Sequence, residues 1–238
     1  MRESINTITI ENISHAYRDD ESVLRNVNAI FEKGDSISIM GTSGVGKTTL
    51  LKIMSGLMKP SDGKVLFDHI DYYTLSEKKQ ISFRRDNFGF VFQSFELISE
   101  LTVYENIIFP LLLGGKKEKK AAAKEYAEEL CSALELDDLR SRYPGELSGG
   151  QQQRTAIARA LIRRPEILFC DEPTGNLDQS TSEAVMNLLT QINERYHTTL
   201  IIVTHDREIA ARTRKIYRMS ENGVLSEERG ASCQEPAC

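Results

Sequence analysis

The stretch that most constrains the fold of this chain is GTSGVGKT at residues 41–48, which fits the pattern G-x-x-x-x-G-K-[ST]. It follows the apolar alternation SISIM and precedes the helix-like TTLLKIMSGL, so a strand, a glycine-rich turn and a helix are expected in that order. Glycines let successive backbone N–H groups point at phosphate oxygens, and the helix N-terminus adds the positive end of its dipole. The pattern therefore predicts a phosphate-binding loop in an α/β fold, rather than a glycine-rich turn without a ligand.

The chemistry of such a loop assigns roles to its last two residues. Lys47 would reach the β- and γ-phosphates of a nucleotide, and the Thr48 hydroxyl would ligate Mg²⁺. A second metal ligand is needed because a single hydroxyl does not hold Mg²⁺ on a nucleotide. The run EILFCDEP supplies Asp171 at the carboxyl end of an apolar strand, where open α/β sheets place their ligands. Glu172 would point differently and polarise a water for attack on the γ-phosphate, the alternative for this pair being an exposed acidic turn.

The rest of the chain changes from strand-like to helix-like and back. INTITIENI and VLRNVNAIFEKGDSISIMG alternate apolar and polar residues, with a turn at Gly34 and Asp35, and are interpreted as antiparallel strands. From about residue 117 the apolar positions Tyr126, Leu130 and Leu134 recur every four residues, which predicts a helix whose basic residues within 116–124 face solvent rather than lipid. EILFCDEP and TTLIIVTHD are expected to be buried parallel strands joined by a crossover helix.

Composition limits the partners of this chain. The 238 residues carry a net charge of -5, which gives no electrostatic basis for nucleic-acid binding. The longest apolar runs reach about half of the roughly 20 residues that span a bilayer, and the N-terminus has no signal-peptide pattern, so a soluble cytosolic protein is expected. Cys170 falls in a predicted buried strand, whereas Cys233 and Cys238 lack a nearby histidine and indicate a tail rather than a metal site.

The stretch LSGGQQQR at residues 147–154 determines which kind of phosphate-loop protein is expected. A serine hydroxyl and glycine N–H groups at a helix N-terminus form a second anion cradle, here Ser148, Gly149 and Gly150 before a helix-like run. The eight residues resemble the signature motif of ATP-binding cassette (ABC) ATPases. In that family the motif caps the γ-phosphate of ATP on the opposite subunit, so the resemblance implies a site completed by a second copy of the chain.

The resemblance covers about residues 7–225 and assigns four further residues. Gln93 in FGFVFQSFELI matches the Q-loop glutamine, a contact to Mg²⁺ and water. Asp178 in GNLD matches the D-loop, which crosses the dimer interface, although the commoner form of that loop is SALD. His205 in IIVTHD matches the switch histidine that contacts the γ-phosphate. Tyr17 in ISHAYRDD stands where the family places an aromatic side chain against adenine, a core tyrosine being the alternative.

The resemblance implies an α/β fold, a P-loop NTPase ABC ATPase core with an N-terminal antiparallel β-subdomain. An α-helical subdomain would be inserted at about residues 95–162, residues 1–228 would form a single domain, and 229–238 would be a disordered tail. ATP and Mg²⁺ are the expected cofactors, and active hydrolysis is expected. The predicted catalytic residues are Lys47, Gln93, Glu172 and His205, the Mg²⁺ ligands are Thr48, Gln93 and Asp171, and the ATP contacts are Tyr17, Gly41, Thr42, Ser43, Gly44, Val45, Gly46, Lys47, Thr48, Thr49, Ser148, Gly149, Gly150 and Asp178.

DEPTGNLD and FELISELTVYENIIFPLLLGG are similar to the ATPases of macrolide and antimicrobial-peptide exporters and lipoprotein-release systems. That branch implies a separate transmembrane permease and a peripheral position on the inner face of the cell membrane. The segment 87–113 is the expected permease contact through Phe95, Leu97 and Ile98, which could instead be core of the helical subdomain. A non-transport regulator of a cell-division complex is the main alternative function. A soluble cassette acting on ribosomes or DNA, and a small-molecule kinase, are disfavoured because the chain has one cassette, an acidic balance and the signature motif.

Overall fold

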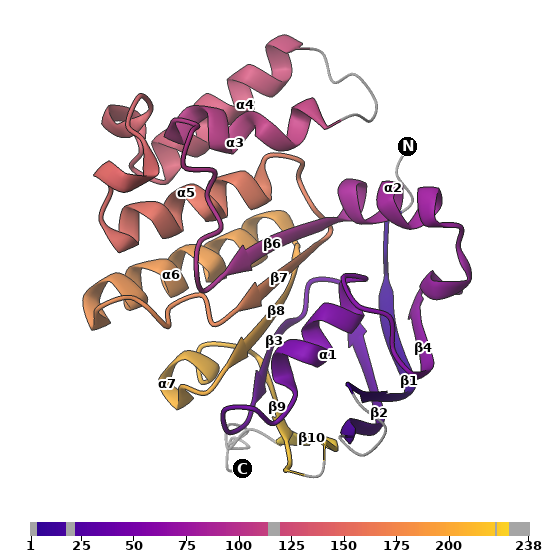
Figure 1. Ribbon diagram of the computed structural model, residues 1–238. Coiled ribbons are helices and arrows are strands. Elements are labelled where there is room, and N and C mark those ends of the chain that lie inside the picture. Colours follow the sequence, from indigo (N-terminus) through magenta and orange to yellow (C-terminus); the bar gives the residue numbers. More distant parts are fainter. Residues whose placement is uncertain (1–3, 18–21, 114–119, 222, 229–238) are drawn as a thin grey trace, which may run out of the picture.

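A mostly parallel sheet runs through the centre of the molecule in the computed structural model, which describes residues 4–17, 22–113, 120–221 and 223–228 (Figure 1). Its strand order is β10-β9-β3-β8-β7-β6, and β10 is antiparallel to its neighbour. A second, antiparallel sheet has the order β2-β1-β4-β5. The strands are β1 (Thr7–Ala16), β2 (Ser22–Glu32), β3 (Ser36–Met40), β4 (Asp62–Phe67), β5 (Ile70–Asp71), β6 (Phe88–Phe92), β7 (Ile167–Asp171), β8 (Thr199–Thr204), β9 (Lys215–Met219) and β10 (Leu225–Glu228).

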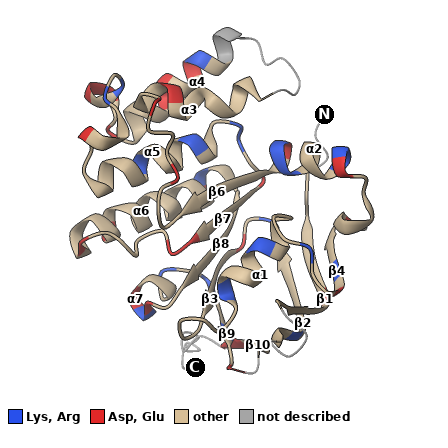
Figure 2. Cartoon of the chain, viewed as in Figure 1, with Lys and Arg blue, Asp and Glu red and all other residues tan. Residues whose placement is uncertain are grey.

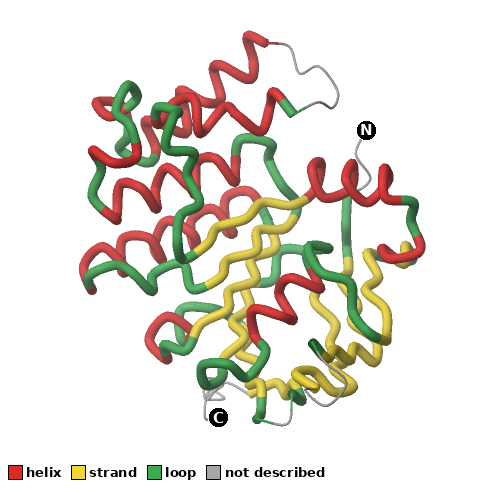
Figure 3. The backbone as a smooth tube through the Cα atoms, in the orientation of Figure 1, coloured by secondary structure: helices red, strands yellow, loops and turns green. Residues whose placement is uncertain are grey.

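Two cores lie on the two faces of the parallel sheet. Alternate residues of each strand point to opposite faces, so Phe169 and Ile201 enter one core while Cys170 and Ile202 enter the other. Helix α1 and the antiparallel sheet cover the first face, helices α5 and α6 cover the second, and α3 and α4 pack on α5 (Figure 3). The helices are α1 (Lys47–Met54), α2 (Glu77–Asn87), α3 (Val103–Leu112), α4 (Lys120–Ala133), α5 (Gly149–Leu161), α6 (Gln179–Tyr196) and α7 (Arg207–Ala210).

The strand at residues 36–40 corrects one expectation. β1 and β2 pair antiparallel as predicted, but β3 does not pair with β2 after the turn at Gly34 and Asp35. It lies between β8 and β9 and is parallel to both. All five residues of β3 are buried, and a strand that is buried on both faces is typical of the centre of a parallel sheet rather than of a half-exposed hairpin.

The helical part of the chain confirms the predicted fold class. Helices α3, α4 and α5 lie between β6 and β7 in the chain and form a layer beside the parallel sheet (Figure 1). Tyr126, Leu130 and Leu134 are buried at 6%, 4% and 2% exposure, so the four-residue spacing identified the correct face of α4. Among the described residues, no helix combines the length and the apolar character needed to cross a membrane.

Charged residues lie on most elements of the described part of the chain. Figure 2 shows that acidic and basic residues are interspersed over most elements, with basic residues on α2. Cys170 is a buried free thiol of β7, as predicted, and burial raises the pKa of this thiol. The range 229–238, with Cys233 and Cys238, lies outside the described residues, as do residues 116–119 of the predicted basic helix face.

Asn106 of α3 hydrogen-bonds to the backbone of the segment 98–102, which lies between β6 and α3. Its side chain is fully buried, and its Nδ2 donates to the backbone oxygens of Ile98, Leu101 and Thr102 at 2.9–3.0 Å. Its Oδ1 accepts from the backbone N–H of Ile98 at 2.8 Å. One amide side chain thus hydrogen-bonds to four backbone groups of the segment 98–102, of which the oxygens of Ile98 and Thr102 also accept from backbone N–H groups.

The substitution Asn106→Ala should lower the free energy of unfolding by about 2–4 kcal/mol, because it removes all hydrogen bonds of a buried side chain, including those to the N–H of Ile98 and the oxygen of Leu101. Urea denaturation of the two proteins would measure the difference. Glu100→Ala is the matched control, because Glu100 is exposed on the same segment and should change stability by less than about 0.5 kcal/mol. Equal stability of the Asn106 variant and the parent protein would contradict this interpretation.

Candidate nucleotide-binding site

The predicted phosphate loop connects β3 to α1. Gly44 and Gly46 have φ angles of 80° and 107°, values that residues with a Cβ rarely adopt. A Cβ on Gly46 would also lie 2.8 Å from Cγ1 of Val23, so this glycine allows close approach to β2. Gly46 is the N-cap of α1 and supplies no side-chain acceptor, which leaves the first N–H groups of the helix available to an anion.

Lys47 is held inside the loop. Its side chain is nearly buried, and its ammonium donates to the backbone oxygens of Gly41 and Thr42 at 2.8 and 2.9 Å. Burial lowers the pKa of Lys47, and the carboxylates of Glu172 and Asp171 act in the opposite direction. The carboxylates at the end of β7 therefore favour the charged form of the ammonium.

Asp171 and Thr48 meet although they are far apart in the sequence. The Thr48 hydroxyl donates to Oδ1 of Asp171 at 2.9 Å. Burial raises the pKa of Asp171, and the hydrogen bond from Thr48 opposes that shift. A hydroxyl and a carboxylate are oxygen ligands of the kind that Mg²⁺ prefers, so the pair fits a magnesium ion that brings phosphate oxygens with it. Within the described part of the chain, no group of three or more His, Cys, Asp and Glu residues could hold a metal by itself.

Glu172 lines the same cavity as the phosphate loop and contacts His205. Its φ angle is +46°, a left-handed conformation that is uncommon for a residue with a side chain and marks local strain. The backbone N–H of Glu172 donates to the oxygen of Val203, and its Oε1 lies 2.8 Å from Nδ1 of His205. Adjacent residues of one strand end thus point in different directions, as the sequence predicted.

A cavity of about 480 Å³ joins these groups. Tyr17 lies at its edge and is 54% exposed, which rules out the alternative that it is a core residue. Its hydroxyl lies 2.9 Å from that of Thr49, close enough for a hydrogen bond. The residues that line the cavity are Tyr17, Val23, Ser43, Gly44, Gly46, Lys47, Thr48, Thr49, Gln93, Glu172 and His205.

The predicted ATP contacts in the signature motif and the D-loop lie outside this cavity. None of Ser148, Gly149, Gly150 and Asp178 lines the cavity. Ser148 caps α5 in a reciprocal capping box with Gln151, and Asp178 caps α6. The hydroxyls of residues 180 and 181 hydrogen-bond to Asp178 and hold the pKa of its carboxyl well below the usual range.

The starts of α5 and α6 pack against each other beside these caps. A Cβ on Gly150 would lie 2.5 Å from Cγ2 of Thr181, so only glycine fits there without a shift. Gln153 is fully buried in α5, and its Nε2 donates to the backbone oxygen of Pro173, directly after Glu172. Gln153 had no predicted role, because its position within QQQ gives no local signal of this contact.

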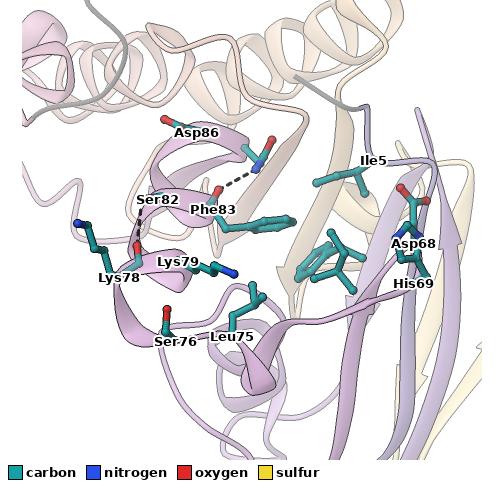
Figure 4. A pocket seen from close by; sticks show the side chains of 13 residues that line it. Ile5, Asp68, His69, Leu75, Ser76, Lys78, Lys79, Ser82, Phe83 and Asp86 are labelled. Atoms are coloured by element: carbon teal, nitrogen blue, oxygen red, sulfur yellow. Dashed lines mark hydrogen bonds between the residues drawn. The ribbon is translucent and has the colours of Figure 1, made fainter. Parts of the chain in front are cut away.

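Another cavity, of about 790 Å³, lies between α2 and the turn that joins β4 to β5 (Figure 4). Leu75 and Phe83 contribute apolar surface to it. Polar groups that line this cavity are already hydrogen-bonded within the chain. Oδ1 of Asp68 accepts from the backbone N–H groups of Asn6 and Thr7, and Nδ2 of Asn87 donates to the backbone oxygen of Phe83. No predicted ATP contact lines this cavity, so the cavity of about 480 Å³ is the candidate nucleotide site.

The geometry defines a nucleotidase of the phosphate-loop class, and comparison with known proteins narrows the class. The profile described as ABC transporter matches residues 24–175. The chain belongs to this family and is an ATP-binding cassette with ATPase activity, which confirms the resemblance and the predicted enzyme class. The kinase alternative is therefore wrong.

Relatives and solved structures agree with this membership. The chain is 40% identical to the ABC transporter ATP-binding protein YtrE of Bacillus subtilis, over 92% of this chain and 96% of that protein. It is 43% identical to the lipoprotein-releasing system ATP-binding protein LolD of Syntrophotalea carbinolica, over 85% and 88%. It is 41% identical to the macrolide export ATP-binding/permease protein MacB of Syntrophobacter fumaroxidans, over 94% of this chain and 32% of that protein.

Among solved structures, the chain resembles a dimeric post-hydrolysis state of the ATP-binding cassette MJ0796 bound to ADP and Pi. The TM-score is 0.83 with 38% identity, and the match covers 94% of this chain and 99% of that one. A second dimeric structure of MJ0796, described as a bacterial ABC transporter cassette, has the same TM-score with 39% identity and the same coverage.

Replacing Glu172 with glutamine should reduce ATP hydrolysis by about 100-fold or more, because an amide cannot accept a proton as a general base. ATP binding should be retained, since the phosphate loop is unchanged. Steady-state phosphate release and equilibrium binding would measure the two effects. Glu208→Gln is the matched control, because this exposed carboxylate on α7 should be dispensable. Hydrolysis at the wild-type rate by the Glu172 variant would contradict the role of Glu172 as the general base.

Asp171→Asn should raise the melting temperature of the nucleotide-free protein at pH 7. Burial raises the pKa of this carboxyl in the folded state, so its charged form costs stability above that pKa, and the cost disappears below the unfolded-state value of about 3.9. The asparagine oxygen can still accept the Thr48 hydrogen bond. Thermal denaturation at pH 7 and at pH 4 should show a stabilisation that shrinks at acid pH, and a lower melting temperature at pH 7 would be the opposite result.

Proposed function

We propose that this chain is the ATP-hydrolysing subunit of a bacterial ABC transporter complex whose permease is a separate polypeptide. The cargo class we propose is that of the export and envelope-processing branch: antimicrobial peptide, macrolide, bacteriocin or lipoprotein. The similarity to LolD and MacB proteins supports this branch. Residues 1–228 would form one ATPase domain, located in the cytoplasm on the inner face of the membrane through the permease.

The observation that carries the proposal is the division of the predicted site into two surfaces. Lys47, Glu172 and His205 share one cavity, whereas the cradle at Ser148 lies outside it. Ser148 is exposed at the N-terminus of α5, so its hydroxyl and the following N–H groups can receive an anion from another molecule. Two copies arranged head to tail would each contribute one surface to each ATP, in line with the dimeric neighbours.

In the closed site, the residues of this chain would bind and orient the reactants. Tyr17 would stack on adenine, and the loop N–H groups with Lys47 would hold the phosphates. Thr48, Gln93 and Asp171 would hold Mg²⁺, which when bound neutralises charge on the phosphate oxygens. Glu172 would accept a proton from the attacking water, and His205, at 2.8 Å from Glu172, would help to orient it.

The dimer is tested with the Glu172→Gln protein, which should retain ATP. With ATP and Mg²⁺ this protein should elute from a sizing column as a dimer. Adding Ser148→Arg should leave a monomer that still binds ATP, because the bulky cation fills the cradle of the partner's γ-phosphate. Ser132→Arg, an exposed serine on α4, is the control and should still dimerise. Equally strong dimerisation of the Ser148→Arg protein would refute the head-to-tail arrangement.

A groove of about 350 Å³ between α2, β6, α3 and α5 supports the position of the permease. It lies within and beside the segment 87–113 that the sequence identified. Leu113 at its edge is 61% exposed, and Ile81 is 47% exposed. Phe95 and Leu97 are half-buried, and neither belongs to the two buried cores, which favours a contact role over a core role. An apolar segment of the permease would cover this surface.

Leu113→Asp should lower the amount of permease that co-purifies with the chain at least tenfold, because it places a charge in an apolar interface. ATP binding should not change. Co-purification from detergent-solubilised membranes of the native host, followed by mass spectrometry, measures this amount. Ile30→Asp is the control, because Ile30 is 59% exposed on β2 outside the groove. A captured permease with a large extracytoplasmic domain would support the exporter branch, whereas a cell-division protein or ribosomes would contradict it.

A further inference from the structure

A reciprocal contact joins the loop after β7 to the end of β6. Nδ2 of Asn176 donates to the backbone oxygen of Gln93 at 3.0 Å, and Nε2 of Gln93 donates to Oδ1 of Asn176 at 3.3 Å. Gly175 lies against the same side chain, because a Cβ there would be 2.8 Å from Nε2 of Gln93. This contact depends on the departure of the chain from SALD: an alanine at position 176 has no amide and could make neither bond.

The backbone oxygen in this contact determines the direction of both side-chain amides. A carbonyl oxygen only accepts, so Asn176 must present its NH₂ group to the backbone of Gln93. Its Oδ1 then faces the Gln93 side chain and also only accepts, so Gln93 must present Nε2 to it. The Oε1 of Gln93 is left over, and Gln93 lines the nucleotide cavity together with Lys47 and Thr48.

We propose that Asn176 is a positioning residue that fixes the Gln93 carboxamide so that Oε1, and not Nε2, is offered to the Mg²⁺ of the bound nucleotide. Magnesium requires oxygen ligands, and an amide NH₂ group turned toward it would be repelled. The proposal rests on the function proposed above, in which Gln93 is a Mg²⁺ contact. Asn176 itself would touch neither the metal nor ATP.

The test measures binding rather than turnover. In a background that carries both Glu172→Gln and Ser148→Arg, which should stay monomeric, the dissociation constant of a fluorescent ATP analogue is measured with Mg²⁺ and with EDTA, and their ratio is the affinity gained from the metal. Asn176→Ala should reduce that gain about three- to tenfold, the effect of losing one or two hydrogen bonds. Binding in EDTA should stay unchanged. Gly175→Ala should reduce the gain in the same way, because its Cβ displaces the Gln93 amide.

Two further variants make the result specific. Gln93→Ala should reduce the gain at least as much as Asn176→Ala, and the double variant should equal Gln93→Ala alone, because Asn176 acts only through Gln93. Gln179→Ala removes an exposed amide close by in the chain and should leave the gain unchanged. Melting temperatures establish that each variant is folded.

The outcomes separate this proposal from the function on which it rests. If Gln93→Ala reduces the metal-dependent gain while Asn176→Ala does not, or if the two effects add, the positioning role is refuted and the Gln93 contact stands. If Gln93→Ala leaves the gain at the parent value, the assignment of Gln93 to Mg²⁺ is refuted together with the positioning role. A loss by Asn176→Ala that is equally large in EDTA would also refute it, since the metal is then not involved.

Discussion

The hydrogen bond between Thr48 and Asp171 joins the two halves of the nucleotide site, which are 123 residues apart in the sequence. Its geometry depends on the parallel sheet, in which β8 lies between β3 and β7 and brings their carboxyl ends to one edge. Because the strands are buried on both faces, their register is fixed by two cores at once. The fold therefore positions the loop and the acidic residues before any ligand arrives.

At the same edge of the sheet, several groups adopt states that lower the stability of the folded chain. Burial raises the pKa of Asp171 and lowers the pKa of Lys47, so the charged form of each group is less stable here than in water. Glu172 adopts a left-handed backbone conformation at the next position. These costs fall on adjacent groups of one site, while the apolar residues on either side of the sheet are well buried. Such a distribution is expected where function selects residues that folding alone would not.

Patterns confined to one segment predicted the fold class, the buried face of α4 and the phosphate loop, because spacing and glycine content are local properties. The partners of β3 were not predictable in this way, since alternation in SISIM does not tell whether the next strand pairs beside it or the chain crosses over. The contacts of Asn106, Gln153 and Asn176 were also missed. Each is a polar side chain that hydrogen-bonds to a backbone oxygen of a loop, and no hydrophobic periodicity indicates such a partner.

The two helix starts that pack together, those of α5 and α6, differ in the charge of their caps. Ser148 is a neutral cap, so the positive dipole end of α5 is not compensated. Asp178 places a carboxylate on α6, and that carboxylate is held in its charged form by the neighbouring hydroxyls. An anion that approaches this surface therefore meets one attractive helix end and one that is already neutralised. The choice of hydroxyl or carboxylate at a single cap position decides which of two neighbouring helices can act as an electrostatic receptor.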